Sequence, residues 1–331
     1  MSLTLVDYVW IGGDGELRSK TRVLYDAIVL SDIPEWNYDG SSTNQADGAC
    51  SEVFLSPKRL FNCPFRDNGL IVICDTYLPH GIPAKKNHRH DALQIFNKYR
   101  DQEPWYGLEQ EYFIYDCVTS LPIGYDPEGK QGQYYCSVGG KNAFGRQISD
   151  EHLYACLLAG IQISGTNLEV APGQLEYQVG PVEGIDAADQ LIASRYILEK
   201  VSERYDTYIV YHPKPLKGDW NGSGCHANFS TKSMRAENGL DVILACMPKL
   251  EAKHAEHMAI YGDHNDERMS GDHETSRYDQ FTYGIGNRKA SIRIPNDIVN
   301  ERKGYFEDRR PAANIDPYLV TAKILETVMQ D

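Results

Sequence analysis

Two glutamates stand two residues apart in WYGLEQEYFIYD, the segment from Trp105 to Asp116. The aromatic and β-branched residues of this segment predict a strand, and the period of two in a strand puts Glu109 and Glu111 on one face. Two carboxylates placed in this way repel each other unless a cation lies between them. Taken alone, the pair also fits a solvated edge strand, but its apolar neighbours favour a central position in a sheet.

A second pair of carboxylates, Glu169 and Glu176, lies in NLEVAPGQLEYQV, the segment from Asn167 to Val179. The segment predicts two short strands, and if only Pro172 and Gly173 form the turn, the two glutamates face each other across the hairpin. Like charges directly opposite destabilise a sheet, so this register makes sense only with a cation between them. A longer loop would change the pairing.

A histidine, His226, joins these carboxylates as a candidate ligand for a hard cation. Oxygen-rich sites with at most an occasional imidazole suit Mg²⁺ or Mn²⁺ better than Zn²⁺. The surrounding sequence KPLKGDWNGSGCHANFS is rich in glycine from Asn221 to Gly224, which lets the backbone approach a ligand closely. A surface turn before a strand explains the same glycines equally well.

Arginines are concentrated in the last third of the chain, at Arg288 and Arg293 in GNRKASIRIP and at Arg309 and Arg310 in KGYFEDRRP. Strand alternation puts Arg293 on the face opposite its two isoleucine neighbours. Guanidinium groups beside bound cations are what phosphoryl transfer requires, because negative charge spreads over the phosphate oxygens in the transition state. Ion pairs with surface acids are the competing explanation.

The elements that carry these residues divide the chain into a β-rich domain, residues 1–82, and a larger mixed domain, residues 83–331. The glycine-rich segment Gly12–Gly15 is interpreted as a hairpin turn, because it lacks the lysine and the following helix of a phosphate-binding loop. In the first domain, strands are predicted at Tyr8–Ile11, Thr21–Tyr25, Val53–Leu55 and Leu70–Cys74.

Three helices are predicted in the second domain, at residues 88–99, 186–205 and 239–261. Asp186 is expected to cap the second helix, and Pro248 either to kink the third or to begin another. The polar stretch 262–276 has no apolar periodicity and is expected to be a mobile loop over the site. Helices and strands that mix without regular βαβ spacing indicate an α+β fold.

Composition excludes several classes of function. A formal net charge of −14 opposes general binding to nucleic acids or anionic membranes, so anionic substrates must be bound locally. No apolar run reaches the length of a membrane span, and the N-terminus lacks the features of a signal peptide, so a cytoplasmic location is expected. The eight cysteines contain no C-x-x-C pair and are interpreted as reduced packing residues.

Several motifs, in order, resemble those of glutamine synthetases of the eukaryotic type (class II). Each is modest alone, but their joint occurrence from about Val9 to Val328 is highly specific. The resemblance implies a β-grasp-like N-terminal domain and a larger catalytic domain whose antiparallel sheet forms an active-site funnel with two divalent cations. Besides the segments quoted above, the motifs are WNYDGSSTNQA at residues 36–46, GTNLEVAPGQLEYQVGP at 165–181, HETS at 273–276 and GYFEDRRPAAN at 304–314.

The resemblance also implies roles for individual residues. One cation would be held by Glu111, Glu169 and Glu176, and the other by Glu109, His226 and Glu307. Glutamate would be bound by Asn221, Gly222, Arg268 and Arg309, beside Glu111 and His226. Arg288 and Arg293 would face the ATP phosphates, and the rest of the nucleotide would lie near Ser230, Arg235 and Tyr305.

The implied reaction activates a poor electrophile. ATP transfers its γ-phosphoryl group to the side-chain carboxylate of glutamate, and ammonia then attacks γ-glutamyl phosphate to give glutamine, ADP and phosphate. Arg288 and Arg293 would stabilise the phosphoryl charge, and Asp39 would take a proton from ammonium. Glu274 on the lid would exclude water and accept a proton from the adduct. Mg²⁺ or Mn²⁺ is the expected cofactor, with ATP as co-substrate.

The family assembles as pentameric rings, singly or as a decamer, in which the small domain of one subunit brings the Asp39 loop to the next. This chain begins almost at the first strand and stops soon after residues 317–329, so it is expected to be shortened at both ends, where the family makes ring contacts. Leu175, Asp272 and Lys289 depart from the family pattern and are expected to affect substrate fit and lid movement.

Three other functions stay open. A ligase that joins another amine, or another γ-carboxylated substrate, would differ in the ammonium pocket, where Asp39, Ser42 and Glu274 are of the type the resemblance predicts. A non-catalytic structural or regulatory relative could lose metal or lid carboxylates without penalty, and none is missing. An unrelated metal-binding module would leave the ordered motifs unexplained.

Overall fold

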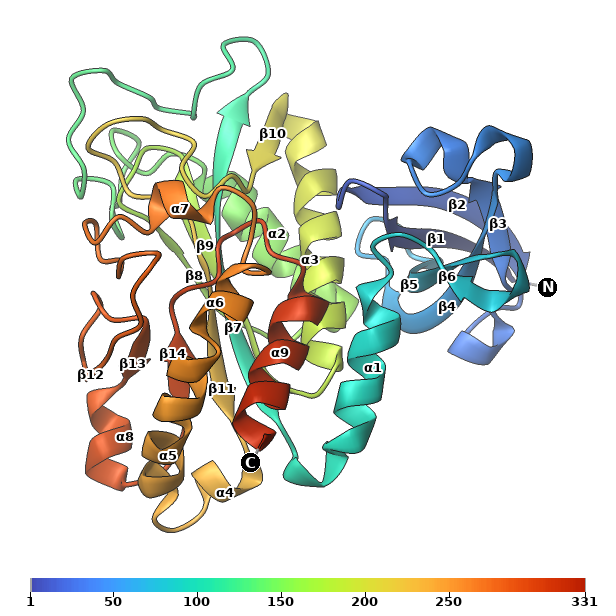
Figure 1. Ribbon diagram of the computed structural model, residues 1–331. Helices are drawn as coiled ribbons and strands as arrows, with labels where there is room; N and C mark the ends of the chain where they lie inside the picture. The colour runs from blue at the N-terminus through green and yellow to red at the C-terminus, as the bar shows by residue number, and fades with distance from the viewer. Residues whose placement is uncertain (1, 331) are drawn as a thin grey trace.

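The computed structural model describes residues 2–330, in which two β-sheets lie side by side with helices between them (Figure 1). The first sheet has the order β2-β1-β5-β4-β3, with β6 paired to β5. Its pairs are antiparallel except β1 with β5. The strands are β1 (Leu3–Ile11), β2 (Leu17–Tyr25), β3 (Trp36–Asp39), β4 (Glu52–Asn62), β5 (Gly69–Leu78) and β6 (Ile82–Pro83).

The four strands predicted for this part of the chain are confirmed, since each forms part of β1, β2, β4 or β5. The predicted glycine turn is confirmed as well. It joins β1 to β2, and the Gly12 N–H donates to the Glu16 carbonyl at 2.8 Å. No phosphate-binding loop forms at these described residues, because the chain continues directly into β2.

The second sheet has eight strands in the order β12-β13-β14-β11-β7-β9-β8, with β10 also paired to β7. All its pairs are antiparallel except β12 with β13. The strands are β7 (Trp105–Asp116), β8 (Ile163–Leu168), β9 (Gln174–Glu183), β10 (Thr207–Val210), β11 (Cys225–Ser230), β12 (Tyr283–Ile285), β13 (Ile292–Ile294) and β14 (Phe306–Asp308). The predicted bounds of β7 and its central position are confirmed.

The hairpin of β8 and β9 departs from the predicted register. Glu176 pairs with Asn167 rather than with Glu169, whose backbone N–H donates to the Gln174 carbonyl at 2.8 Å. The prediction was wrong by two residues because the loop spans residues 170–173 and not the Pro-Gly pair alone. Glu176 still faces a carboxylate, because its partner on the other side is Glu111 of β7.

Nine helices and six short 3-10 segments occur within residues 2–330. The helices are α1 (His88–Lys98), α2 (Arg146–Ala159), α3 (Asp186–Ser202), α4 (Lys232–Arg235), α5 (Gly239–Ala252), α6 (His254–Met258), α7 (Asn265–Arg268), α8 (Asn296–Glu301) and α9 (Pro317–Met329). The 3-10 segments are η1 (Leu30–Asp32), η2 (Gly40–Thr43), η3 (Gly48–Cys50), η4 (Pro79–Gly81), η5 (Arg100–Gln102) and η6 (Glu203–Tyr205).

Three helix predictions need correction. Asp186 does not cap α3, because the cap position is Ile185 and the Asp186 carboxylate accepts a hydrogen bond from Arg59 Nε at 2.5 Å. Pro248 does not begin another helix, because α5 runs through it, and the predicted helix 239–261 is divided at Lys253 into α5 and α6. The stretch 262–276 is not loop throughout, because it contains α7.

The small sheet is joined to the large one through α3, which packs on β7, β9 and β10 and also touches β5. Val9 and Ile73 of the small sheet belong to the same buried apolar core as Leu191 and Ile192 of α3. Charged contacts reinforce this joint. Arg89 of α1 donates to Asp189 of α3 at 2.8 Å, alongside the Arg59 contact described above. The two sheets therefore share one large core, and the small sheet has a second, smaller core of its own around Tyr8 and Leu55.

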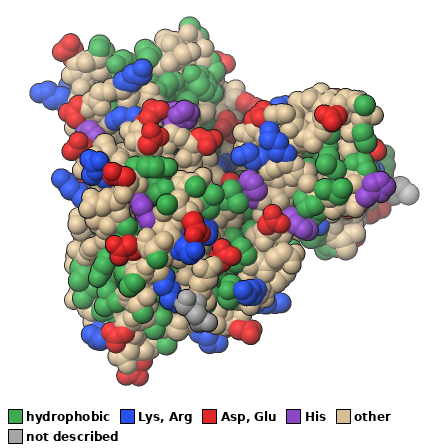
Figure 2. Space-filling view, viewed as in Figure 1, with side chains coloured by type: hydrophobic (Ala, Val, Ile, Leu, Met, Phe, Trp, Pro, Cys, Tyr) green, Lys and Arg blue, Asp and Glu red, His purple; other side chains and the backbone are tan. Residues whose placement is uncertain are grey.

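Figure 2 shows a notch between the small and large parts of the molecule. It is a cleft of about 870 Å³ between the β1–β2 hairpin, α3 and the segment before α9. Acidic and basic side chains are interspersed on the visible face. Within residues 2–330, no helix has the length and apolar character needed to cross a membrane. The eight cysteines are free.

Candidate active site

A cavity of about 500 Å³ opens on the large sheet, and most of the predicted site residues line it. The lining comes from β7, β9 and β11, from the loops that follow β8 and β10, and from the segment between α7 and β14. Acidic side chains on the strands therefore face basic side chains from the last third of the chain. The predicted residues that line it are Glu109, Glu111, Glu169, Glu176, Asn221, Gly222, His226, Arg268, Glu274, Arg288, Arg293 and Arg309.

Three predicted ligands of one cation form a compact group. One donor atom each from Glu109, His226 and Glu307 lies within 4.8 Å of the other two. His226 Nδ1 lies 3.4 Å from Glu109 Oε2 and 3.6 Å from Glu307 Oε1. The register of the sheet produces this group, because His226 of β11 pairs with Glu109 of β7, and β14 borders β11 on its other side.

The histidine of this group is suited to bind a cation. Burial, and then the charge of Arg309, hold the pKa of His226 well below its ordinary value. The imidazole is therefore neutral and has a lone pair to offer.

The second predicted ligand set is more open. Glu111, Glu169 and Glu176 line the same cavity, but within the described residues they do not come as close together as the first set. Burial raises the pKa of all three carboxyl groups, and neighbouring carboxylates raise it further. A bound cation would offset both effects, so the buried acids fit a divalent ion.

Hydrogen bonds fix two of these carboxylates. Glu111 Oε2 accepts from the Gly224 N–H at 2.8 Å, and Glu169 Oε1 accepts from Asn167 Nδ2 at 2.8 Å. The glycine-rich segment before β11 thus places a backbone donor on Glu111, which the sequence predicted only as a close approach to a ligand.

Arginines hold Glu307, which is fully buried. Arg309 Nη1 donates to Glu307 Oε1 at 2.7 Å, and Arg293 Nε donates to its other oxygen. The predicted alternation in β13 is confirmed, since Ile292 and Ile294 are buried while Arg293 faces the cavity. The two guanidinium groups therefore orient a candidate cation ligand and also border the cavity.

Another arginine closes the cavity behind the glycine-rich loop. The Nη2 group of Arg268 donates to the Arg310 carbonyl at 2.6 Å, and its side chain packs on Gly222. A Cβ atom at Gly222 would lie 2.4 Å from Arg268 Cγ and 2.3 Å from the Pro213 carbonyl oxygen, so only glycine fits there.

A second cavity, of about 420 Å³, adjoins the first and contains the residues predicted to lie near the nucleotide. The two cavities share Glu109 and Gln178. The second is walled by aromatic and small residues and by the predicted contacts Ser230, Arg235 and Tyr305. The second cavity, called the apolar slot below, is therefore mostly apolar and adjoins the charged first cavity.

Arg235 lies at the wall of this slot. Its guanidinium carbon is 3.9 Å from the centroid of the Trp105 ring, and its Nη2 group donates to the Glu103 carbonyl at 2.8 Å. Its Nη1 group is buried and has no hydrogen-bond partner among the described residues. An acceptor supplied by a ligand would satisfy this donor.

The structure adds site residues that the sequence did not single out. Gln131 Nε2 donates to Asn221 Oδ1 at 2.6 Å and lies 3.2 Å from His273 Nδ1, so its side chain joins three loops. Gln174 Nε2 donates to the Gly222 carbonyl at 2.9 Å. Three of the added residues lie two positions from a predicted glutamate, namely Asn167, Gln174 and Gln178. The period of two in a strand could therefore have identified them from the sequence. Gln131 lies in a turn-rich stretch with no such signal.

Asp39 is not near this site. It ends β3 in the small sheet, is exposed, and lines neither cavity. Figure 1 shows β3 and the strands β13 and β14 on opposite sides of the molecule. Hydrogen bonds from Ser41 and Ser42 lower the pKa of Asp39 to about 2. Glu274, by contrast, lines the first cavity, so one chain does not bring these two residues together.

The three departures from the family pattern lie in different places. Leu175 is fully buried in the apolar core and lines neither cavity, so it does not contact a substrate there. Asp272 and Lys289 are exposed, each next in sequence to a residue that lines the first cavity, His273 and Arg288.

Comparison with known proteins supports the assignment of these residues to one family. A model of the glutamine synthetase catalytic domain matches residues 89–241. A putative glutamine synthetase of Acanthamoeba polyphaga mimivirus is 66% identical over 335 residues, which cover 99% of this chain and 95% of that protein.

Plant enzymes match over a similar range. The cytosolic isozyme 1-3 of Arabidopsis thaliana glutamine synthetase is 50% identical, over 98% of this chain and 94% of that protein. The chloroplastic leaf isozyme of Hordeum vulgare is 51% identical, over 98% of this chain and 77% of that protein. Because identity at this level extends over nearly the whole chain, the chain belongs to the glutamine synthetase family.

Proposed function

We propose that this chain performs the ATP-dependent ligation of ammonia to glutamate with the work divided between its two cavities. Glutamate and the cations bind in the first cavity, and the nucleotide binds in the second. The observation that carries the proposal is the compact group Glu109, His226 and Glu307: Glu109 lines both cavities, His226 lines the first, and Glu307 is fully buried beside them.

The donor set of the first cavity fits Mg²⁺ or Mn²⁺. Five carboxylates and one neutral imidazole are hard or borderline donors, and the buried acids gain from a positive charge. One ion is held by Glu109, His226 and Glu307, and the other by Glu111, Glu169 and Glu176. When bound, the ions neutralise phosphate charge and polarise phosphoryl and carboxylate oxygens.

The nucleotide enters through the apolar slot. The ring of Trp105 and the Arg235 guanidinium form one wall, and the unpaired Nη1 donor of Arg235 is free for an acceptor on the nucleotide. Since Glu109 belongs to both cavities, the phosphates point from the slot toward the cations. Arg293 and Arg288 then neutralise the γ-phosphoryl group as it moves to glutamate.

Glutamate is held by the loop around Asn221 and Gly222 and by the arginines Arg268 and Arg309. The backbone of that loop is fixed by Gln131 and Gln174, so its polar groups are in place before substrate binds. Glu274 on the lid excludes water from the acyl phosphate and takes a proton after ammonia has attacked.

The ammonium site is completed by a second copy of the chain. Asp39 is exposed at the end of β3, whereas Glu274 of the same chain lines the first cavity, which Asp39 does not. We therefore propose a homo-oligomer of pentameric rings, in which the Asp39 loop of one subunit reaches the first cavity of the next. A cytoplasmic location belongs to the same proposal, and one relative is named a cytosolic isozyme.

The test is phosphate release from ATP, measured with each substrate omitted in turn. Release should require glutamate, ammonium and a divalent cation, and a chelator should abolish it until Mg²⁺ or Mn²⁺ is restored. Full activity in excess chelator would exclude the cation assignment. Methylamine that replaces ammonium with equal kcat/KM would favour a ligase that forms another γ-glutamylamide.

A further inference from the structure

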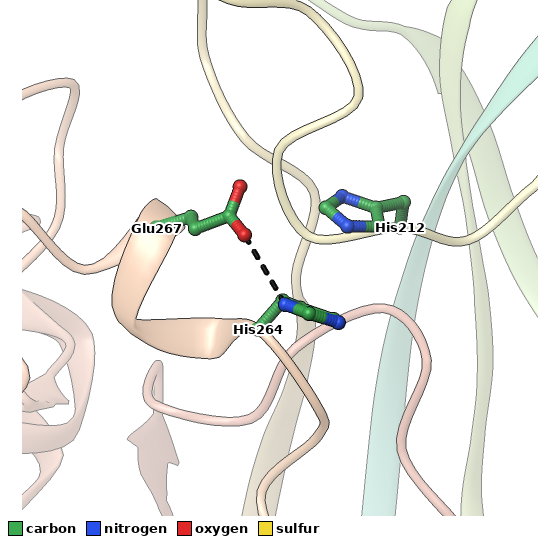
Figure 3. A group of neighbouring side chains, drawn as sticks. All are labelled: His212, His264 and Glu267. Atoms are coloured by element: carbon green, nitrogen blue, oxygen red, sulfur yellow. Dashed lines mark ion pairs between the residues drawn. The ribbon is translucent and has the colours of Figure 1, made fainter.

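Two histidines and a glutamate meet outside both catalytic cavities. His212 follows β10, His264 directly precedes α7, and Glu267 lies within α7 (Figure 3). One donor atom of each residue lies within 4.8 Å of the other two. His212 is half-buried, while His264 and Glu267 are exposed, so an ion in solution has direct access to the cluster.

Two of the three side chains already have the spacing of ligands on one ion. His264 Nδ1 lies 3.2 Å from Glu267 Oε1, the contact drawn in Figure 3. Bonds of about 2.0–2.2 Å to a tetrahedral ion place neighbouring donor atoms roughly 3.3–3.6 Å apart. The distance between these two atoms is therefore already close to that between two ligands of one tetrahedral ion.

The third side chain is close enough to complete the set. The His212 ring stacks on the His264 ring with centroids 5.3 Å apart and an interplanar angle of 27°. His212 Nδ1 accepts the Lys214 N–H at 3.0 Å, so this nitrogen is unprotonated and offers its lone pair in exchange for the amide. One ring nitrogen of His212 already lies within 4.8 Å of a donor atom of His264 and of Glu267.

We propose that His212, His264 and Glu267 form a binding site for a borderline divalent transition ion such as Zn²⁺. Two imidazoles and one carboxylate are a donor set that Zn²⁺ uses with a water in the fourth position. The oxygen-rich catalytic cavity prefers harder ions, so the molecule separates two classes of metal by donor type.

An ion at this site would connect two segments that contact the loop around Asn221 and Gly222, the loop that we propose binds glutamate. Pro213, next to His212, accepts the Ser223 N–H at 2.8 Å. Arg268, at the end of α7, packs on Gly222. A bound ion would clamp α7 to the segment at residue 212 and so brace the loop from both sides. This consequence rests on the proposed function, because it assumes that the loop binds glutamate.

The binding test measures how many Zn²⁺ ions bind to each chain. The chelator-treated chain is titrated with Zn²⁺ by calorimetry, and the stoichiometry is compared between the wild type and His264→Asn. Asparagine tolerates the left-handed backbone at this position, where φ is 60°, and removes the imidazole. His80→Asn is the matched control, because His80 is also exposed and also left-handed, with φ of 68°.

The expected result is one Zn²⁺ fewer per chain in His264→Asn than in the wild type and in His80→Asn. Glu267→Gln should weaken binding at that site about tenfold while leaving the chain folded, as its Mg²⁺-dependent activity would show. Replacement of Zn²⁺ by Co²⁺ should add an imidazole-dependent visible absorption that His212→Asn removes. Equal zinc counts in all variants would overturn the proposal.

A second measurement separates the site from the ligase function. Zn²⁺ should change the KM for glutamate by several-fold in the wild type and not in His264→Asn, at saturating Mg²⁺. If the KM does not respond in the wild type, the clamp is wrong. If zinc binds with the expected stoichiometry but the wild type forms no glutamine, the proposed function fails while the metal site stands.

Discussion

Arg293 combines two tasks in one guanidinium group. It donates to Glu307, a proposed cation ligand, and it also borders the cavity in which we propose that the γ-phosphoryl group is transferred. A charge-assisted contact used in the transition state contributes to rate far more than to substrate binding. The residue therefore affects kcat directly and the cation site through its partner.

The first prediction is that Arg293→Ala lowers kcat by roughly thirty- to a thousandfold, which corresponds to about 2 to 4 kcal/mol of transition-state stabilisation. Steady-state kinetics at saturating ATP and Mg²⁺ measure this loss. Arg302→Ala is the control, because Arg302 is exposed and pairs with exposed Asp241 at 3.1 Å, so its turnover should be unchanged. Normal turnover in Arg293→Ala would exclude this residue from phosphoryl transfer.

Glu109 offers a second test at the same scale, since it lies in the walls of both cavities. In the wild type, Asn228 Nδ2 donates to Glu109 Oε1 at 2.8 Å. Glu109→Gln keeps the shape of the side chain and can still accept this hydrogen bond, but it removes the negative charge. The metal concentration for half-maximal activity should rise about ten- to a hundredfold, a loss of the size seen when cation sites are weakened. A Mn²⁺ titration measures it.

The control for this variant is Glu103→Gln. Glu103 is exposed and pairs with Lys232 at 2.7 Å. It is a glutamate like Glu109, but it lines neither cavity. If both variants need the same concentration of Mn²⁺ as the wild type, Glu109 is not a cation ligand.

The sequence predicted charged site residues well and neutral ones poorly. Neighbouring carboxylates in a sheet repel each other unless a cation lies between them, and this argument identified Glu109, Glu111, Glu169 and Glu176. An amide such as Gln131 carries no such cost, so nothing in the sequence marks it until the fold brings it to Asn221. Asp39 is a different case, because its motif is clear in the sequence while the structure places it away from both cavities.

At the scale of elements, β7 organises the site. It borders β9, β10 and β11, and its alternate residues point into the first cavity. Buried residues such as Leu108, Tyr112 and Ile114 fix it in the core, so its glutamates are held by packing rather than by a loop. This rigidity explains how the sheet can hold several buried acids together.

Helix α2 carries a buried histidine that links the stability of the fold to pH. His152 Nε2 lies 3.0 Å from the Ser194 carbonyl of α3, and the ring packs on Tyr177. Burial lowers the pKa of His152 to about 4, whereas an unfolded histidine titrates near about 6.5. Below pH 6.5 the unfolded chain therefore binds a proton that the folded chain excludes, and stability falls as pH falls.

The third prediction concerns this slope. Lowering the pH from 7 to 5 should reduce the free energy of unfolding of the wild type by about 2 kcal/mol more than that of His152→Gln, which has no titrating group there. Urea unfolding at both pH values measures the difference, with exposed His80→Gln as the control. Equal losses in the wild type and His152→Gln would show that His152 does not titrate in this range.

Residue patterns predicted β7 with its bounds, parts of the four long strands of the small sheet, and the regions of α1, α3 and α5, and the errors have local causes. The β8–β9 register was wrong because the Pro-Gly pair lies inside a longer loop, and a pattern of residue types does not fix loop length. Pro248 lies inside α5 and does not begin another helix, because packing of Cys246, Met247 and Leu250 outweighs the hydrogen bond that proline loses.

At the scale of the whole molecule, the proposed assembly makes each chain contribute to two different active sites. Its first cavity has the proposed cation ligands and the lid, and its small sheet has the Asp39 loop on the far side. If rings form as proposed, each site takes one half from each of two neighbours. A single subunit on its own should then be inactive.

The fourth prediction uses this division. Asp39→Asn and Glu307→Gln should each be inactive alone, because each removes one half of every site. Co-expressed in equal amounts and mixed at random, they should regain about a quarter of the wild-type activity, since that share of interfaces joins two intact halves. Native mass spectrometry confirms that mixed rings formed. No recovery in demonstrably mixed rings, or a fully active monomer, would contradict the shared site.

The joint between the two sheets has a geometric consequence for such a ring. Arg59 and Arg89 fix α3 to its surroundings, and a shared core leaves the small sheet one orientation. In such a ring, the small sheet of each subunit contacts the large sheet of the next. The angle between the two sheets of one chain then sets the rotation from one subunit to the next, and the ring closes only if these rotations add up to a full circle. Arg59→Ala should therefore loosen that angle and yield rings of unequal subunit number or open helical filaments, which electron micrographs would distinguish from uniform pentagons.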